Sequence, residues 1–136
     1  MKILVPLDSS EFSLKALERA IDIAKKEGGD LVLMSVALDF RDVEEIPLRY
    51  VDRLKQQAMR AVDVGKEIVE KAGLKPEIRV ETGVSPADNI VKCAEEINAG
   101  LIVIGHRGIA GFGRFLVGSV AARVVAYAPC SVLVVR

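Results

Sequence analysis

Five short apolar runs alternate along this chain with four longer segments in which apolar residues recur every three or four positions. Runs of the first kind are typical of buried β-strands, and the second spacing is typical of amphipathic helices. The expected strands cover residues 2–8, 31–38, 77–81, 101–105 and 131–135. The expected helices cover about 14–24, 51–72, 86–97 and 115–127. The resulting order is β-α-β-α-β-α-β-α-β.

This alternation predicts an α/β fold: a five-stranded, mainly parallel sheet with right-handed crossovers and helices on both faces, in three layers. The run at 31–38 is continuously apolar, as expected for a parallel strand that is covered on both sides. Residues 77–81 instead alternate strictly between charged and apolar side chains. This pattern favours an edge strand with one face in water.

Local signals place the helix boundaries. Ser10 is a cap-type residue that precedes an acidic first turn at Glu11. Ser85 precedes a proline and stands three residues before Asp88, which resembles a capping box. Gly65 falls in the middle of the second helix, where glycine costs up to ~1 kcal/mol relative to alanine. We expect a close approach of this helix to the sheet at Gly65.

Length and charge narrow the classes of function. The 136 residues fit one domain, 1–136, and 19 basic residues balance 19 acidic ones. Such a balance favours neither nucleic acid nor an anionic membrane as a partner. No apolar run approaches the ~20 residues of a membrane helix, and the chain enters its first strand without a signal-peptide pattern. A cytoplasmic location is therefore expected.

The cysteines and the single histidine offer little metal chemistry. Cys93 and Cys130 match no zinc spacing, so we expect both to be buried thiols. One histidine, His106, makes a histidine-based metal site improbable because such sites combine several ligands. His106 is either a solvent-facing loop residue or a phosphate contact.

A glycine-rich loop follows the fourth expected strand, between Ile102 and Ser119. Glycine lets backbone amides converge on one point, and convergent amides beside a helix N-terminus attract anions, phosphate above all. The loop is not a P-loop, because Arg114 and Phe115 stand where lysine and a hydroxyl residue are needed. A dinucleotide-binding fingerprint would follow the first strand, whereas this loop follows the fourth. A receiver domain of a phosphorelay would need an acidic pair, a further aspartate and a lysine after three different strands, and these residues are not all present.

Asp8 ends the first expected strand and Gly105 ends the fourth. Ligands of open parallel sheets bind beyond the strand C-termini, where the strand order reverses. A 3-2-1-4-5 order would make these two strands neighbours at that point. Asp8 and the glycine loop would then face one crevice.

Three motifs resemble the universal stress protein family over nearly the whole chain. They are residues 5–9 (Val-Pro-Leu-Asp-Ser), the spacing Gly105-x2-Gly108-x9-Gly118-Ser119, and residues 128–135 (Ala-Pro-Cys-Ser-Val-Leu-Val-Val). The chain departs from the family at His106, where a serine or threonine is common, and at Ser131, where a second proline is common. The resemblance implies the ATP-binding, UspA-like subgroup and a Rossmann-like fold of the adenine nucleotide α-hydrolase type.

The resemblance also implies a nucleotide site. Its residues would be Pro6, Asp8, Val36, Ile104, Gly105, His106, Arg107, Gly108, Gly118, Ser119 and Val120. Asp8 would accept hydrogen bonds from the ribose hydroxyls, and Pro6 and Val36 would border the adenine. The backbone over 104–108 would meet ribose and phosphate, and residues 118–120 would hold the remaining phosphates. Arg107 either reaches solvent or swings toward a triphosphate.

Plainer roles remain open for three of these residues. Asp8 could cap the first helix, because carboxylates favour that position. Gly118 could serve only to let the fourth helix pack closely. Ser119 could do no more than cap its own helix.

The function that follows is an ATP-occupied sensor or regulator in stress response, with Mg²⁺ or Mn²⁺ held through the phosphates. The loop has no lysine and no evident general base, so any ATP hydrolysis should be slow. The alternative is a nucleotide-free interaction protein on the same fold.

Residues 132–135 are continuously apolar, and in a 3-2-1-4-5 order they form an edge strand without protective charges. We expect a homodimer in which this strand pairs antiparallel with its counterpart, as the resemblance also implies. The alternative is that a loop or the C-terminus covers the edge.

Overall fold

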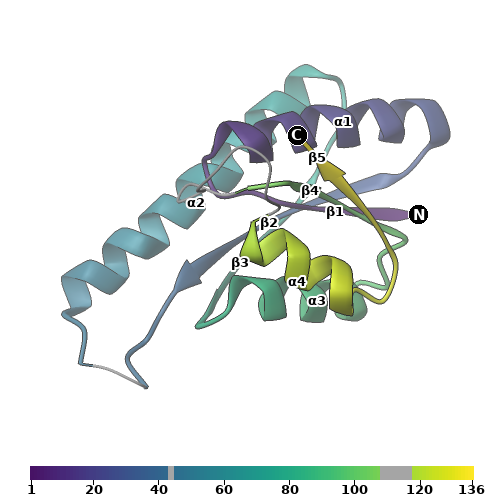
Figure 1. Cartoon of the computed structure of the whole chain (residues 1–136). Coiled ribbons are helices and arrows are strands. Elements are labelled where there is room, and N and C mark those ends of the chain that lie inside the picture. The colour runs from purple at the N-terminus through teal and green to yellow at the C-terminus, as the bar shows by residue number, and fades with distance from the viewer. Residues whose placement is uncertain (43–44, 108–117) are drawn as a thin grey trace.

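The computed structural model describes residues 1–42, 45–107 and 118–136 (Figure 1). In chain order its elements are β1 (Lys2–Pro6), α1 (Glu11–Glu27), β2 (Asp30–Leu38), α2 (Leu48–Lys71), β3 (Glu77–Gly83), α3 (Pro86–Glu96), β4 (Leu101–Gly105), α4 (Ser119–Tyr127) and β5 (Ser131–Val135). The strands form one five-stranded sheet in the order β3-β2-β1-β4-β5. Every pairing is parallel, which confirms the expected α/β fold and its two edge strands.

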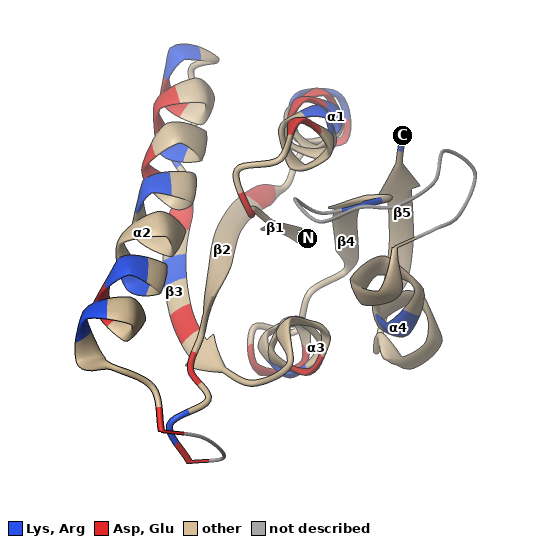
Figure 2. Cartoon of the chain, turned by 60° about the vertical axis from the view of Figure 1, so that its left-hand side comes forward, with Lys and Arg blue, Asp and Glu red and all other residues tan. Residues whose placement is uncertain are grey.

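Helices cover both faces of the sheet (Figures 1 and 2). Successive β1 residues point to opposite faces, so Ile3 and Val5 join a core with α1 and Leu4 joins a second core with α3 and α4. The first core includes Leu17, Leu33 and Val69, and the second includes Val32, Met34, Ile102 and Val124. These side chains are at most 2% exposed, and each contributes roughly 1.5–3 kcal/mol through burial.

The expected caps are confirmed. The Ser10 hydroxyl accepts from the Ser13 amide at 3.1 Å and caps α1. The Ser85 hydroxyl accepts from the Asp88 amide at 3.3 Å and caps α3. Each of these bonds satisfies one amide that the first helical turn leaves without a partner.

α2 passes close to the sheet at Gly65. A Cβ at this position would stand 2.4 Å from Cδ1 of Leu7 and 3.2 Å from Cδ1 of Leu33. The expected close approach is therefore confirmed, since real Cβ atoms essentially never come so near a neighbour.

The predicted start of the fourth helix is wrong. Gly118 is extended, with φ −61° and ψ 155°, and it is the N-cap, so α4 begins at Ser119. Phe115, the expected first residue, lies outside the described residues. Apolar spacing alone could not locate the first residue of α4, because Leu116 and Val120 fit one helical repeat.

The two cysteines differ in environment. Cys93 is fully buried in α3, and burial raises the pKa of its thiol to about 11. Cys130 is only half-buried, so the expectation of two buried thiols holds for Cys93 alone. No helix within the described ranges has the length and apolar character to cross a membrane. A cytoplasmic location stays a prediction.

Candidate functional site

The carboxyl ends of β1 and β4 separate at the centre of the sheet. In the part of the chain that the structure describes, these strands pair through Ile3 with Leu101 and through Leu4 with Ile102. Beyond those pairs β1 continues along β2, and β4 continues along β5 as far as Gly105. The strand order reverses at this point, which is where open α/β sheets bind their ligands.

Pro6 lies at the separation. Lys2 accepts from the Gly100 amide on the β4 side, whereas the Leu7 amide donates to Met34 on the β2 side. Because successive residues of a strand present their backbone groups to alternate sides, Pro6 faces β4. Proline has no N–H, so no donor is left unpaired where the two strands part.

Asp8 follows β1 and is held by its own loop. Ser9 adopts a left-handed conformation, with φ 71°, which brings the Ser10 amide back to Asp8 Oδ1 at 3.0 Å. Ser10 rather than Asp8 caps α1, so the plain capping role for Asp8 is wrong. Asp8 Oδ2 has no hydrogen-bond donor among the described residues and remains available to a ligand.

The start of α4 carries unpaired amides. The first bond of the helix runs from the Ala122 amide to the Gly118 carbonyl at 2.9 Å. The amides of Ser119, Val120 and Ala121 precede it and have no acceptor within the described ranges. Such a helix start attracts anions through its free N–H groups and its macrodipole.

Gly118 is constrained by the protein itself. Its amide donates to the His106 carbonyl at 2.6 Å. A Cβ on Gly118 would stand 3.1 Å from that carbonyl oxygen and 3.3 Å from Cα of Arg107. These contacts are tighter than most real Cβ contacts, so close packing favours glycine here. Ser119 is the first helical residue and not the cap, so its plain capping role is wrong.

His106 joins several elements at the end of β4. Its amide donates to the Val135 carbonyl at 2.8 Å, so the residue continues the β4–β5 contact. The imidazole packs edge-on against Phe12 of α1, with ring centroids 4.6 Å apart. His106 is only 5% exposed, and the expectation of a solvent-facing loop residue is wrong. A phosphate contact stays a prediction.

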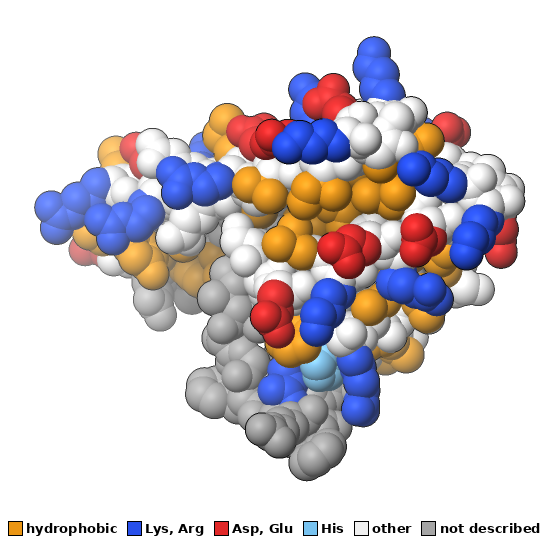
Figure 3. Space-filling view, turned by 90° about the horizontal axis from the view of Figure 1, so that it is seen from above, with side chains coloured by type: hydrophobic (Ala, Val, Ile, Leu, Met, Phe, Trp, Pro, Cys, Tyr) orange, Lys and Arg blue, Asp and Glu red, His pale blue; other side chains and the backbone are white. Residues whose placement is uncertain are grey.

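The surroundings of His106 disfavour its protonated form. Burial is the main reason that its pKa is lowered, and the positive charges of Arg107, Arg136 and Lys15 lower it further. Figure 3 shows the histidine flanked by basic side chains. Neither ring nitrogen has a hydrogen-bond partner among the described residues. The imidazole is therefore neutral near pH 7.

The remaining expected site residues take different positions. Val36 and Ile104 lie on the face of the sheet that packs against α3 and α4. Gly105 lies against α1, and a Cβ there would stand 2.7 Å from the carbonyl carbon of Phe12. Arg107 is half-buried at the end of the described segment. Gly108 lies outside the described residues.

Sequence reasoning missed the neighbours of His106. Phe12 and Lys15 lie on the first turns of α1, and Arg136 follows β5. One signal could have located them: in a parallel sheet the first turn of α1 and the end of β5 lie at the same edge as the end of β4. The choice of contacting side chains depends on long-range packing.

The open, parallel sheet with its strand-order reversal defines a Rossmann-like α/β protein. The sequence model of the universal stress protein family matches residues 1–136 of this chain. A universal stress protein of Methanocaldococcus jannaschii is 37% identical over 99% of this chain and 81% of its own length. The chain belongs to the universal stress protein family.

Solved structures agree with this assignment. The universal stress protein UspA of Lactobacillus plantarum has a TM-score of 0.87 and 28% identity, covering 100% of this chain and 97% of its own. A universal stress protein of Archaeoglobus fulgidus, solved in complex with dAMP, has a TM-score of 0.76 and 25% identity, covering 100% of this chain and 98% of its own.

Proposed function

We propose that this chain binds an adenine nucleotide between the carboxyl ends of β1 and β4, with ATP as its ligand, and acts as a nucleotide-dependent sensor or regulator. The observation that carries the proposal is the convergence of two complementary groups at one opening. Asp8 presents beyond β1 a carboxylate oxygen, Oδ2, that has no donor among the described residues. The first amides of α4, which have no acceptor in the described part of the chain, lie beyond β4, to which the bond between Gly118 and His106 ties them.

These groups suit the two polar ends of a nucleotide. The hydroxyls of a ribose are donors, and a carboxylate accepts them in charge-assisted bonds. Phosphate oxygens are acceptors, and the amides of Ser119 and Val120 are donors at the positive end of a helix dipole. Pro6 and Val36 supply apolar surface at the ends of β1 and β2 for the base. The dAMP complex of the Archaeoglobus relative supports this class of ligand.

Binding rather than hydrolysis is the proposed activity. The described residues contain no group of three or more histidine, cysteine or acidic side chains that could hold a metal ion. The described side chains therefore do not suit a metal centre built by the protein alone. Mg²⁺ or Mn²⁺ would be coordinated through the phosphate oxygens of the nucleotide. The neutral imidazole of His106 is engaged with Phe12 and is not placed as a base.

The decisive experiment measures the ligand directly. Nucleotide released from freshly purified protein by heat is identified by mass spectrometry, and ATP, AMP, cAMP and dAMP are then titrated by calorimetry into nucleotide-free protein. We expect an adenine nucleotide to co-purify and ATP to bind with one-to-one stoichiometry. If no adenine nucleotide binds, the proposal fails and a nucleotide-free interaction protein is the better description.

We also propose that β5 pairs antiparallel with its counterpart in a homodimer. β5 is an edge strand, and Val132 to Val135 are all partly exposed. The Val135 carbonyl faces β4, because it accepts from His106. By alternation, the backbone groups of Val132 and Val134 face outward. An apolar edge with outward donors and acceptors is a template for strand pairing, and a two-fold pair closes it.

A further inference from the structure

A groove of about 610 Å³ lies at the opposite edge of the sheet, away from the proposed nucleotide site. It runs along β3 between α2 and α3, the edge to the left in Figure 2. Residues from three elements line it: Lys55 and Met59 of α2, Val80 and Thr82 of β3, and Asn89 and Lys92 of α3. The groove therefore runs along the outer edge of β3, and the inner edge of β3 pairs with β2.

The backbone of β3 presents unpaired groups to this groove. The Gly83 carbonyl accepts from the Asp39 amide, which follows β2, so Gly83 faces inward. The Thr82 carbonyl faces outward and accepts from Asn89 Nδ2 at 3.4 Å. By alternation, the N–H and C=O groups of Ile78 and Val80 also face outward. Among the described residues these groups have no hydrogen-bond partner.

The side chains around this edge combine apolar surface with positive charge. Met59 is 54% exposed and Val80 is 39% exposed, which is unusual for apolar residues that lie beside each other in one groove. Lys55 lies on the α2 side. The pKa of Asp39 is lowered mainly by its pairing with Arg41 at 2.7 Å, and the charge of Lys55 also contributes. Lys92 lies on the α3 side and forms an ion pair with Glu96 of the same helix, at 3.9 Å.

The acidic residue of the groove is already neutralised. Glu81 forms an ion pair with Arg79 at 3.1 Å, and Arg79 also donates a hydrogen bond to Glu96 at 2.7 Å. Arg79 is shared by two carboxylates and Lys92 also pairs with Glu96, so the three cations Lys55, Arg79 and Lys92 outnumber the two carboxylates and leave one net positive charge at this edge. A second copy of the same edge is an unsuitable occupant, because it would bring a second pair of lysines to the contact. Like charges at an edge oppose edge-to-edge pairing of identical strands.

We propose that this groove binds an extended, acidic segment of a partner protein, which adds to the sheet as a strand beside β3. Backbone bonds to Ile78 and Val80 would supply the affinity of strand addition. Apolar side chains of the segment would cover Met59 and Val80. Carboxylates on the segment would meet Lys55 and Lys92, which sets the preference for an acidic partner.

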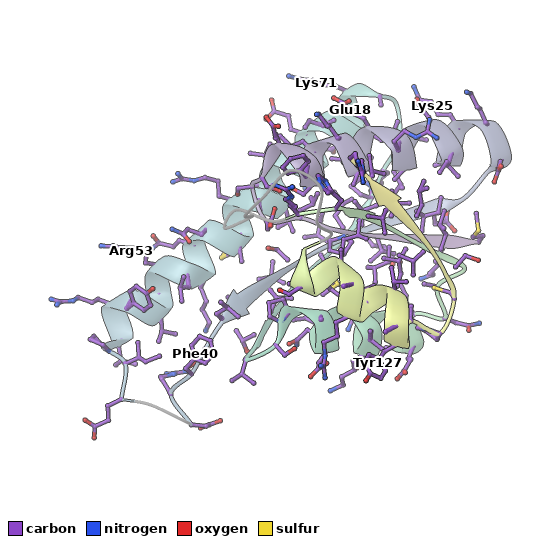
Figure 4. All side chains as sticks on the ribbon, in the orientation of Figure 1. Glu18, Lys25, Phe40, Arg53, Lys71 and Tyr127 are labelled. Carbon is purple, nitrogen blue, oxygen red and sulfur yellow. The ribbon has the colours of Figure 1, made fainter. Side chains whose placement is uncertain are left out.

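The probe is a short, fluorescein-labelled peptide that alternates valine with glutamate, and its binding is followed by fluorescence anisotropy. We expect saturable binding that weakens with added salt. The double variant Lys55→Glu/Lys92→Glu should weaken binding by about tenfold or more, since two attractive pairs become repulsive. Arg53→Glu is the matched control: Arg53 lies on the same helix, and its side chain points away from the sheet (Figure 4).

Two further measurements separate strand addition from general attraction. A peptide with N-methylated backbone amides keeps its charges but loses its donors, and it should not bind the wild-type protein. A peptide that alternates valine with lysine should bind the double variant better than the wild type. The proposal is overturned if the acidic peptide does not bind, if N-methylation has no effect, or if Arg53→Glu weakens binding as much as the double variant. ATP titrations of the same variants should be unchanged, so failure here leaves the proposed nucleotide site intact.

Discussion

Replacing Asp8 with alanine should weaken ATP binding about ten- to a hundred-fold if its carboxylate holds the ribose. Hydrogen bonds to a charged group contribute about 1.5–3 kcal/mol, and every ~1.4 kcal/mol is a factor of ten in affinity. Asp8 Oδ1 already accepts from the Ser10 amide at 3.0 Å, so the bonds to ribose fall mainly on Oδ2. Asp8→Asn, which can retain an oxygen for Ser10 but has no charge, should lie between wild type and alanine.

Calorimetric titration with ATP provides the measurement, and Ser10→Ala provides the control. Ser10→Ala removes the α1 cap, a 3.1 Å bond to the Ser13 amide, and should cost about 1 kcal/mol of stability. It leaves the Asp8 carboxylate in place, so ATP affinity should change little. If Asp8→Ala instead lowers the melting temperature with unchanged ATP affinity, its carboxylate serves only the turn and the ribose assignment is refuted.

Three other changes test separate parts of the structure. Val134→Pro removes an outward N–H of β5 and leaves the hydrogen bonds between β4 and β5 intact. We expect this variant to sediment as a monomer in analytical ultracentrifugation. A wild-type protein that sediments as a monomer at micromolar concentration contradicts the pairing. Gly65→Ala should lower the free energy of unfolding in urea by up to about 2 kcal/mol, because a Cβ 2.4 Å from Leu7 costs about 1–3 kcal/mol in overpacking and alanine regains up to ~1 kcal/mol in helix propensity. The lowered pKa of His106 means that the unfolded chain binds this proton more readily, so stability should fall as pH drops below the ordinary value of 6.5. His106→Gln should flatten that pH dependence in urea titrations, and an unchanged slope would assign the effect to other groups.

The fold was largely predictable because its signals are local and repeated. Continuous apolar runs mark strands that are buried on both faces, and the caps at Ser10 and Ser85 mark helix starts in a few residues each. The start of α4 was not predictable in the same way. In the sequence Leu116 and Val120 fit one helical spacing, whereas the extended backbone of Gly118 makes Ser119 the first helical residue.

The candidate site was predictable by position but not by environment. Strand ends in a parallel sheet determine that Asp8 and Gly105 lie at one edge. The burial of His106 depends instead on Phe12 and on the cations of α1 and the C-terminus, which are distant in sequence. The hydrogen bond from the Ser10 amide to Asp8 depends on the left-handed conformation of Ser9. Two consecutive serines in the sequence do not predict that conformation.

Pro6 has a consequence for how permanent the opening between β1 and β4 is. Two diverging parallel strands could in general form further hydrogen bonds with each other when no ligand lies between them. Here the next backbone group of β1 that faces β4 belongs to a proline, which cannot donate the bond that would extend the ladder toward Gly105. Because Pro6 lacks this donor in every state of the chain, a nucleotide bound as proposed would not have to break a β1–β4 hydrogen bond from Pro6 to enter.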